Sequence, residues 1–122
     1  MIDHITIGVA DLDRSREFYD RALAPLGVER LYADGQNYSG YGIRPKAFFW
    51  IGRRDAVLNG THIAFAAPDR QTVDRFYEAA IAAGGRDNGK PGLRPQYRAN
   101  YYGAFVLDPD GHNIEAVCYA AV

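Results

Sequence analysis

The stretch that decides the fold occurs twice in this chain. Residues 3–27 read DHITIGVADLDRSREFYDRALAPLG, and residues 61–85 read THIAFAAPDRQTVDRFYEAAIAAGG. The two stretches align without a gap at a constant offset of 58 residues, from residue 3 to residue 61. Each copy opens with a histidine, His4 and His62, followed by an isoleucine. A repeat of this length predicts two similar structural units, and the repeated imidazole indicates that both units contribute to one polar site.

The composition is typical of one small globular domain. The chain has 122 residues, 48% of them hydrophobic, which supports one core over residues 1–122, with unit one at 1–57 and unit two at 58–122. A net charge of −1 with scattered Lys and Arg argues against a nucleic-acid partner. The single cysteine, Cys118, predicts a buried structural thiol in a reducing compartment. Without a long apolar stretch or a leader pattern, we expect a cytoplasmic protein with no membrane partner.

The first unit is predicted to fold as βαβββ. Residues 2–9 alternate, with Ile5 and Val9 on one side, which is the period of a half-buried strand. A helix follows, because Asp11 can cap its start and apolar residues then recur every three or four positions until a glycine. Three strand-like runs complete the unit at residues 28–33, 38–43 and 47–53.

The second unit repeats this order. Residues 62–66 predict a strand, and Asp69 can cap a second helix that ends at a glycine pair. The polar, glycine-containing stretch of residues 86–100 predicts a loop with one short strand. Two last strands are predicted at residues 101–107 and 112–119, joined by the tight turn Asp108-Pro109-Asp110-Gly111. The predicted fold class is therefore α+β, with two tandem βαβββ units.

Strand alternation predicts which side chains can meet. If Ile5 packs under the first helix, His4 lies on the opposite face, and the same argument turns His62 away from the second helix. In the last strand Glu115 stands between apolar neighbours. An unpaired carboxylate in such a strand is costly to desolvate, so it needs a cation, a hydrogen-bond donor or a metal as partner.

Two imidazoles and one carboxylate form a set that binds a divalent metal and leaves other coordination positions open. The predicted ligands are His4, His62 and Glu115, and ligands of these types suit Zn, Fe, Mn, Ni or Co. The alternative is that each histidine hydrogen-bonds a neighbour and that Glu115 pairs with an arginine. His112 directly follows the turn and lies outside the repeat, so we expect a solvated side chain there.

The whole chain resembles the vicinal oxygen chelate superfamily, which includes glyoxalase I, bleomycin-resistance proteins, extradiol dioxygenases and fosfomycin-resistance enzymes. The resemblance rests on the tandem units, on DHITIGVADL at residues 3–12 and on LDPDGHNIE at residues 107–115. It implies curled mixed sheets around a U-shaped cavity, helices on the outside, and a metal held by His4, His62 and Glu115. It also implies a substrate that chelates the metal through adjacent oxygens.

The resemblance also bears on the reaction. The first-unit position equivalent to Glu115 is Trp50, where glyoxalase I would have a carboxylate ligand, and an indole cannot replace it. This argues against glyoxalase I activity. A three-ligand site is similar to those of extradiol dioxygenases and fosfomycin-resistance thiol transferases. A dioxygenase-like reaction would use Glu115 together with an acid/base group beside the metal, for which the candidates are Tyr97, Tyr101 and Tyr102.

Several positions are candidates for contact with a small-molecule substrate. Thr6 shares the face of His4, where the fosfomycin-resistance enzymes have a substrate-contacting threonine. Trp50 and Phe48 offer flat walls that suit a small aromatic ligand. Arg94 and Arg98, in the predicted loop, are candidate anion contacts.

The leading hypothesis is a metal-dependent lyase, isomerase or dioxygenase-like enzyme in which the metal acts as a Lewis acid. The competing hypothesis is a metal-free, ligand-sequestering protein like the bleomycin-resistance members, and further alternatives are a fosfomycin-resistance-like thiol transferase and an interaction domain with a vestigial polar site. We expect a homodimer, because half-barrel units bury more surface when paired across a twofold axis. The sequence leaves open whether His4 joins His62 and Glu115 within one chain or across that dimer.

Overall fold

The computed structural model describes all 122 residues and has the predicted element order in both units. The first unit contains four strands, one α-helix and a 3-10 turn: β1 (Ile5–Val9), α1 (Leu12–Ala22), η1 (Ala24–Leu26), β2 (Glu29–Asp34), β3 (Tyr38–Ile43) and β4 (Lys46–Arg53). The second unit contains four strands and one helix: β5 (His62–Ala66), α2 (Arg70–Ala82), β6 (Arg86–Leu93), β7 (Tyr102–Leu107) and β8 (Asn113–Cys118).

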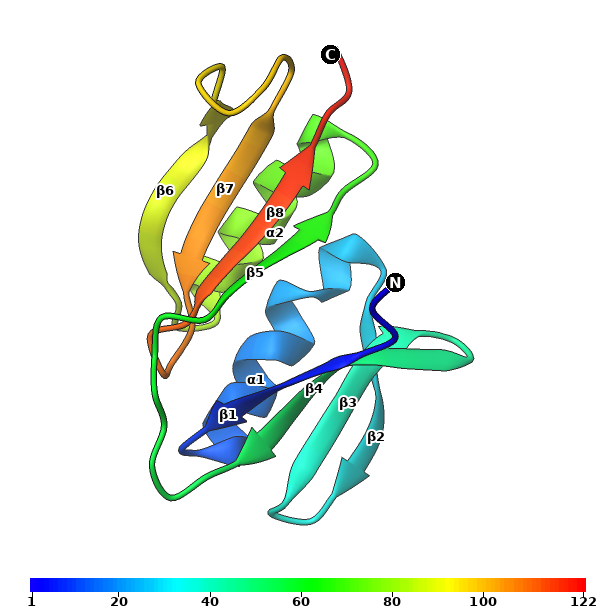
Figure 1. The fold of residues 1–122 in the computed structure, drawn as a ribbon, viewed down its shortest axis with the longest axis vertical. Helices are drawn as coiled ribbons and strands as arrows, with labels where there is room; N and C mark the ends of the chain where they lie inside the picture. The colour runs from blue at the N-terminus through cyan, green and yellow to red at the C-terminus, as the bar shows by residue number, and fades with distance from the viewer.

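The two units share one sheet topology. The first sheet has the strand order β1-β4-β3-β2, and the second has the order β5-β8-β7-β6. The first strand of each unit pairs in parallel with the last: β1 with β4, and β5 with β8. The other pairs are antiparallel, so both sheets are mixed. The predicted α+β fold of tandem βαβββ units is confirmed. β1 and β5 are edge strands that do not pair with each other, so the two sheets are separate. Both edge strands lie toward the middle of the molecule (Figure 1).

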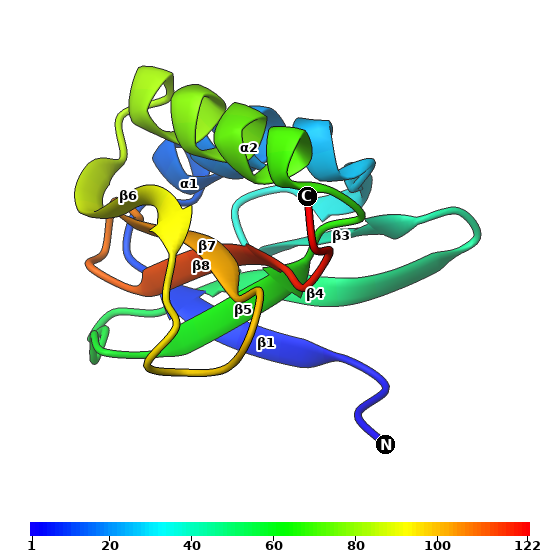
Figure 2. The same ribbon diagram turned by 90° about the horizontal axis from the view of Figure 1, so that it is seen from above.

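Each helix covers one face of its sheet, and both helices lie on the same side of the molecule (Figure 2). The predicted caps are confirmed: the Asp11 carboxylate accepts the backbone N–H of Arg14 at 3.1 Å, and that of Asp69 accepts the N–H of Thr72 at 2.7 Å. The apolar stripes of α1 and α2 are buried in the core. The opposite face of each sheet carries no helix, and we call these two surfaces the open faces.

The stretch after α2 is more ordered than the sequence predicts. Residues 86–93 form an eight-residue strand, β6, where we expected a loop with one short strand, so this prediction is wrong. Its pairing with β7 shifts register on both sides of Gly89, which has a φ of 155° that favours glycine. Pro91 is tolerated because β6 is an edge strand, where a missing N–H interrupts no second ladder.

The predicted turn between β7 and β8 is present and fastens the two units together. The carboxylate of Asp108 accepts the backbone N–H groups of Asp110 at 2.9 Å and His112 at 2.8 Å. It also accepts a hydrogen bond from the hydroxyl of Tyr19, on α1 of the other unit. Burial raises the pKa of Tyr19, which keeps this hydroxyl protonated as a donor.

Three more hydrogen bonds join the turn to the first unit. The Asp110 carboxylate accepts the backbone N–H of Ala10 at 3.0 Å and the hydroxyl of Ser15 at 3.4 Å. The His112 side chain is only 1% exposed, and its Nε2 donates to the carbonyl oxygen of Gly8 at 2.9 Å. The expectation of a solvated His112 is wrong, because the turn folds back onto β1 and the start of α1. We call the contacts of Asp108, Asp110 and His112 with the first unit the inter-unit latch.

Two predictions drawn from composition can also be compared with the structure. Cys118 is buried and unpaired, as expected for a structural thiol. Neither helix has the length and the apolar character needed to cross a membrane.

Candidate functional site

The candidate site is built around the buried carboxylate of Glu115 on the open face of the second sheet. Glu115 is only 1% exposed, and its Oε1 lies 2.8 Å from Nε2 of His62. The pairing of β5 with β8 explains this contact, because Glu115 is the register partner of Ala64 and the His62 side chain projects from the same face of β5 as Ala64. The small Ala64 side chain leaves room for the imidazole to reach the carboxylate. The imidazole is half exposed, so this pair is open to the surface on one side.

The second oxygen of Glu115 is held by Tyr101, whose hydroxyl donates a hydrogen bond to Oε2. Burial and the adjacent Glu115 carboxylate raise the pKa of Tyr101, so its hydroxyl stays protonated. Gly103 makes this approach possible, since a β-carbon there would lie 3.2 Å from Oε2 and 3.1 Å from the Tyr101 ring. The buried carboxylate therefore has one partner on each oxygen, which offsets part of its desolvation cost.

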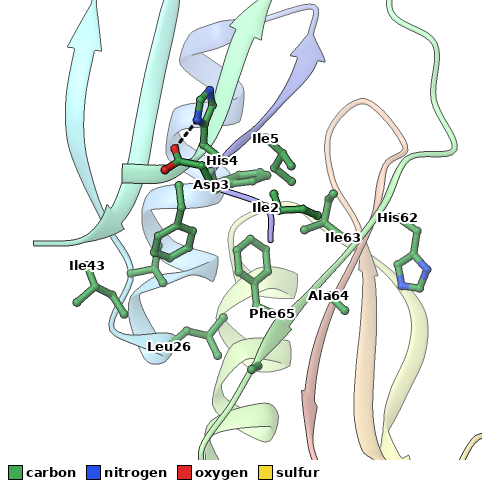
Figure 3. A pocket seen from close by; sticks show the side chains of 14 residues that line it. Ile2, Asp3, His4, Ile5, Leu26, Ile43, His62, Ile63, Ala64 and Phe65 are labelled. Atoms are coloured by element: carbon green, nitrogen blue, oxygen red, sulfur yellow. Dashed lines mark hydrogen bonds and ion pairs between the residues drawn. The ribbon is translucent and has the colours of Figure 1, made fainter. Parts of the chain in front are cut away.

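His4 is not part of this cluster within one chain. Its Nδ1 lies 2.7 Å from Oδ1 of Asp3, which also accepts a hydrogen bond from Lys46 at 2.6 Å. The hydrogen bonds from Lys46 and His4 lower the pKa of the Asp3 carboxyl. Figure 3 shows the rings of His4 and His62 on opposite sides of a groove and pointing away from each other. Within one chain no three side chains of His, Cys, Asp or Glu gather closely enough to hold a metal ion.

The groove between the two histidines is apolar. It has a volume of about 570 Å³ and is lined by 14 residues, 11 of them hydrophobic. Ile5 of β1 and Ile63 of β5 are among them (Figure 3). Phe48, a predicted substrate contact, also lines the groove. The groove thus lies between the edge strands of the two sheets, where neither strand has a hydrogen-bonding neighbour on that side.

The remaining predicted substrate contacts fall in three places. Thr6 and Trp50, which are register partners in β1 and β4, line a second cavity on the open face of the first sheet. Arg94 lines a third cavity together with His62, and its guanidinium lies 5.4 Å from the centre of the Phe105 ring. Arg98 does not line that cavity, because its guanidinium stacks 4.0 Å over the ring of Tyr119.

Of the three predicted acid/base tyrosines, two lie at the site and one lies on the other face of the sheet. Tyr101 contacts Glu115, and the ring of Tyr97 meets the ring of Tyr101 edge-on at 5.1 Å while lining the cavity that contains His62. Tyr102 points to the helix side of the sheet, where its hydroxyl donates to Asp74 of α2 at 2.7 Å. The structure does not bring Tyr102 to the site, because successive residues of a strand project to opposite faces.

One residue near the site was missed by the sequence argument. Arg54 follows the end of β4 and lines the same cavity as Trp50. Strand alternation in the sequence could have identified it, since positions 50, 52 and 54 share one face if the strand continues by one residue. Arg54 was not assigned to this face because the predicted strand ends at residue 53.

Comparison with known proteins agrees with this architecture. A family model described as the glyoxalase/bleomycin resistance protein/dioxygenase superfamily matches residues 1–116. No curated protein matches the chain. Among solved structures, a glyoxalase/bleomycin resistance protein from Albidiferax ferrireducens is 30% identical with a TM-score of 0.81, and the match covers 97% of this chain and 98% of the other.

Two more distant structures show the same fold. A glyoxalase/bleomycin resistance protein/dioxygenase family enzyme from Burkholderia phytofirmans is 16% identical, with a TM-score of 0.75 and coverage of 97% of this chain and 98% of that one. A mutant fosfomycin resistance protein from Listeria monocytogenes, complexed with Mn(II) and a dihydroxypropylphosphonic acid, is 24% identical. Its TM-score is 0.71, and the match covers 96% of this chain and 88% of that protein.

Proposed function

The chain belongs to the glyoxalase/bleomycin resistance protein/dioxygenase superfamily, and from this premise we propose that it is a metal-dependent enzyme acting on a small substrate with two adjacent oxygens. The observation that carries the proposal is the buried Glu115 carboxylate, which faces His62 on one oxygen and Tyr101 on the other. A carboxylate in this position is costly unless a positive charge accompanies it. The Mn(II) in the fosfomycin-resistance structure supports a divalent metal as that charge.

The donor types in this chain fit such a metal. His62 and Glu115 already lie within 2.8 Å of each other and would form two of its ligands. His4, the equivalent histidine of the first unit, would be the third, giving a set of two imidazoles and one carboxylate that suits Zn, Fe, Mn, Ni or Co. When bound, the metal would supply Lewis-acid polarisation of the substrate oxygens.

We propose that the three ligands come together across a homodimer. His4 and His62 lie on opposite sides of the groove and point apart, so one chain presents two half-sites (Figure 3). A partner related by a twofold axis can bring its own His4 to the open face that carries His62 and Glu115. By the same symmetry, the His4 of the first chain reaches the His62 and Glu115 of the partner, so the dimer has two equivalent sites. The apolar groove and the unpaired edge strands β1 and β5 provide surface for such an association.

The neighbouring groups have defined tasks in this proposal. Tyr101 orients Glu115 through its hydrogen bond, as outer partners of metal ligands commonly do. Because burial and the Glu115 carboxylate raise its pKa, Tyr101 would act in the site as a hydrogen-bond donor rather than as a proton donor. Arg94 and Tyr97, which line the cavity beside His62, are placed to contact the substrate.

The reaction class that fits these residues is that of a lyase, an isomerase or a dioxygenase-like enzyme. Trp50 occupies the first-unit position that corresponds to Glu115, and an indole neither binds a metal nor moves a proton in such a role. We therefore exclude the glyoxalase I reaction from the proposal. The buried free thiol of Cys118 fits a cytoplasmic location.

Metal content tests the proposal directly. Purified protein is stripped with EDTA, reloaded with Mn(II) or Co(II), dialysed and analysed for bound metal. His4→Ala and His62→Ala should each lower the bound metal to background, whereas Asp13→Asn, which changes an exposed carboxylate on α1, should leave it unchanged. Equal and negligible metal in the unmodified protein and in all variants would contradict the proposal.

A second candidate function, metal-free sequestration of a ligand, is favoured by one observation. Trp50 and Tyr38 line an open cavity that offers aromatic surface without any predicted metal ligand. This function predicts ligand binding that survives both EDTA and Glu115→Gln, with no metal in the reloading assay. Loss of ligand binding on chelation would contradict it.

A further inference from the structure

The open face of the first sheet carries a cluster of stacked aromatic rings. The Trp50 indole lies flat over the backbone of Gly40, where a β-carbon would come within 2.5 Å of the ring. Tyr32 stacks on the indole, with ring centres 5.8 Å apart and planes inclined by 15°. Tyr38 meets the indole edge-on, also at 5.8 Å. Tyr32 and Tyr38 remain exposed, so this aromatic surface is available to a ligand.

A guanidinium group lies beside these rings on the same face. The side chain of Arg54 covers two glycines, since a β-carbon on Gly52 would lie 2.7 Å from its Nη1 and one on Gly8 would lie 3.0 Å from its Cγ. With glycine at both positions no β-carbon lies between the Arg54 side chain and the sheet.

The donors of Arg54 are largely unused. Its Nη1 donates to the carbonyl oxygen of Arg53 at 3.0 Å, and it forms no ion pair. The adjacent Arg53, in contrast, pairs with Asp55 at 3.0 Å. A guanidinium has five N–H donors in a planar fork that matches a carboxylate. Arg54 therefore presents free, correctly shaped donors for an anionic group.

Tyr38, Trp50 and Arg54 line one cavity of about 470 Å³, together with Thr6 and three other residues. Its size lies within the range of small-molecule sites, roughly 300–1,000 Å³. Aromatic walls beside a cation favour a ligand that has a flat ring and a negative charge.

We propose that this cavity binds a planar aromatic acid, with its ring against Trp50 and Tyr38 and its carboxylate on the guanidinium of Arg54. The inference rests on the proposed function, because it names the substrate class of the same site. His4 directly precedes β1 and is four residues from Gly8, or about 13 Å at 3.3 Å per residue. A ring with two adjacent oxygens at one end and an acid group at the other could direct its oxygens toward the His4 end of β1 while its acid group contacts Arg54.

The single tryptophan of the chain makes the proposal measurable, since Trp50 alone reports indole fluorescence. EDTA-treated protein is titrated with 3-phenylpropionate, with its amide and with 3-cyclohexylpropionate. We expect saturable quenching by 3-phenylpropionate, and at least about tenfold weaker binding of the amide, because a hydrogen-bonded charge contributes enough to change affinity by that factor. The cyclohexyl acid should also bind more weakly, because its ring is not planar.

Variants test whether Arg54 is the cation that binds the ligand carboxylate. Arg54→Gln should weaken 3-phenylpropionate binding at least about tenfold, and Arg54→Lys should weaken it less, because lysine keeps the charge but not the fork. Arg14→Gln, an equal charge change on the exposed surface of α1, should bind as the unmodified protein does. Circular dichroism checks that each variant is folded, and the ligand series on unmodified protein decides the matter if Arg54→Gln does not fold.

Failure of this proposal can be told apart from failure of the proposed function. Equal affinity for the acid and its amide, unchanged binding by Arg54→Gln, or no quenching at all would overturn the aromatic-acid site even if metal binds at His4, His62 and Glu115. Acid-dependent quenching together with negligible metal in the reloading assay would support the aromatic-acid site and contradict the metal-dependent function.

Discussion

Replacing Tyr19 with phenylalanine removes one hydroxyl from the inter-unit latch and should destabilise the whole fold. Tyr19 is fully buried, and its hydroxyl donates to the carboxylate of Asp108, which is 2% exposed. Phenylalanine fills the same space, so the substitution creates no large cavity. Its main effect is to leave the buried carboxylate with only the two backbone donors of Asp110 and His112.

The expected magnitude follows from that change. A hydrogen bond to a charged group contributes about 1.5–3 kcal/mol, and the loss lies toward the upper half of this range when the remaining group stays buried. We therefore expect Tyr19→Phe to lower the free energy of unfolding by about 2.5 kcal/mol. This is a large share of the roughly 5–15 kcal/mol that stabilises a typical domain.

Urea unfolding followed by circular dichroism measures this loss. Tyr102→Phe is a matched control, because it removes a hydroxyl that donates to the half-buried Asp74 at 2.7 Å and joins only elements of the second unit. We expect a loss below about 1 kcal/mol for the control, since water can replace the donor. Equal losses for the two variants, or no loss for Tyr19→Phe, would refute the assignment of the latch as a principal link between the units.

Three further predictions follow from single side chains. Tyr101→Phe removes the hydrogen-bond donor to Oε2 of Glu115 and should weaken Mn(II) binding about 10- to 100-fold in equilibrium dialysis. The variant should remain folded by circular dichroism, and an unchanged affinity for Mn(II) would contradict the orienting role of Tyr101. Gly40→Ala places a β-carbon 2.5 Å from the Trp50 ring and should shift the indole emission and cost about 1–3 kcal/mol of stability in urea unfolding; an unchanged spectrum would argue against the packed indole. Burial raises the pKa of Asp108, so the stability it contributes is fully present below its unfolded pKa near 3.8 and is lost as pH rises through the folded value. The free energy of unfolding of the unmodified protein minus that of Asp108→Asn should therefore fall as the pH rises above about 3.8, and a rise over the same range would contradict the raised pKa of Asp108.

The repeat and the period of the apolar residues were enough to predict most of the fold. The two helices begin after their predicted caps, Asp11 and Asp69, because capping and the apolar stripe are local properties of the sequence. The full length of β6 was not predicted, because its glycines and Pro91 are typical of a loop. Such residues are tolerated at a sheet edge, and edge position is a property of the assembled sheet.

The candidate site was predictable in part. Alternation placed His62 and Glu115 on one face, and the structure brings them within 2.8 Å. Alternation also implies that Tyr101 and Tyr102 face opposite sides, but which of the two shares the face of Glu115 depends on the register between β7 and β8. The burial of His112 also escaped prediction, since it arises from contact with Gly8, more than a hundred positions earlier in the chain.

A mixed dimer tests the central claim, that the metal site is completed by a second copy of the chain. His4→Ala and Glu115→Ala chains with different affinity tags are co-expressed, and the heterodimer is purified through both tags and reloaded with Mn(II). If the site is shared, one of the two sites in the heterodimer has all three ligands: His4 from the Glu115→Ala chain, and His62 and Glu115 from the His4→Ala chain. About one ion per heterodimer should then bind, whereas each mutant homodimer should bind none. A heterodimer that binds no metal, while the unmodified protein binds it, would contradict the shared site.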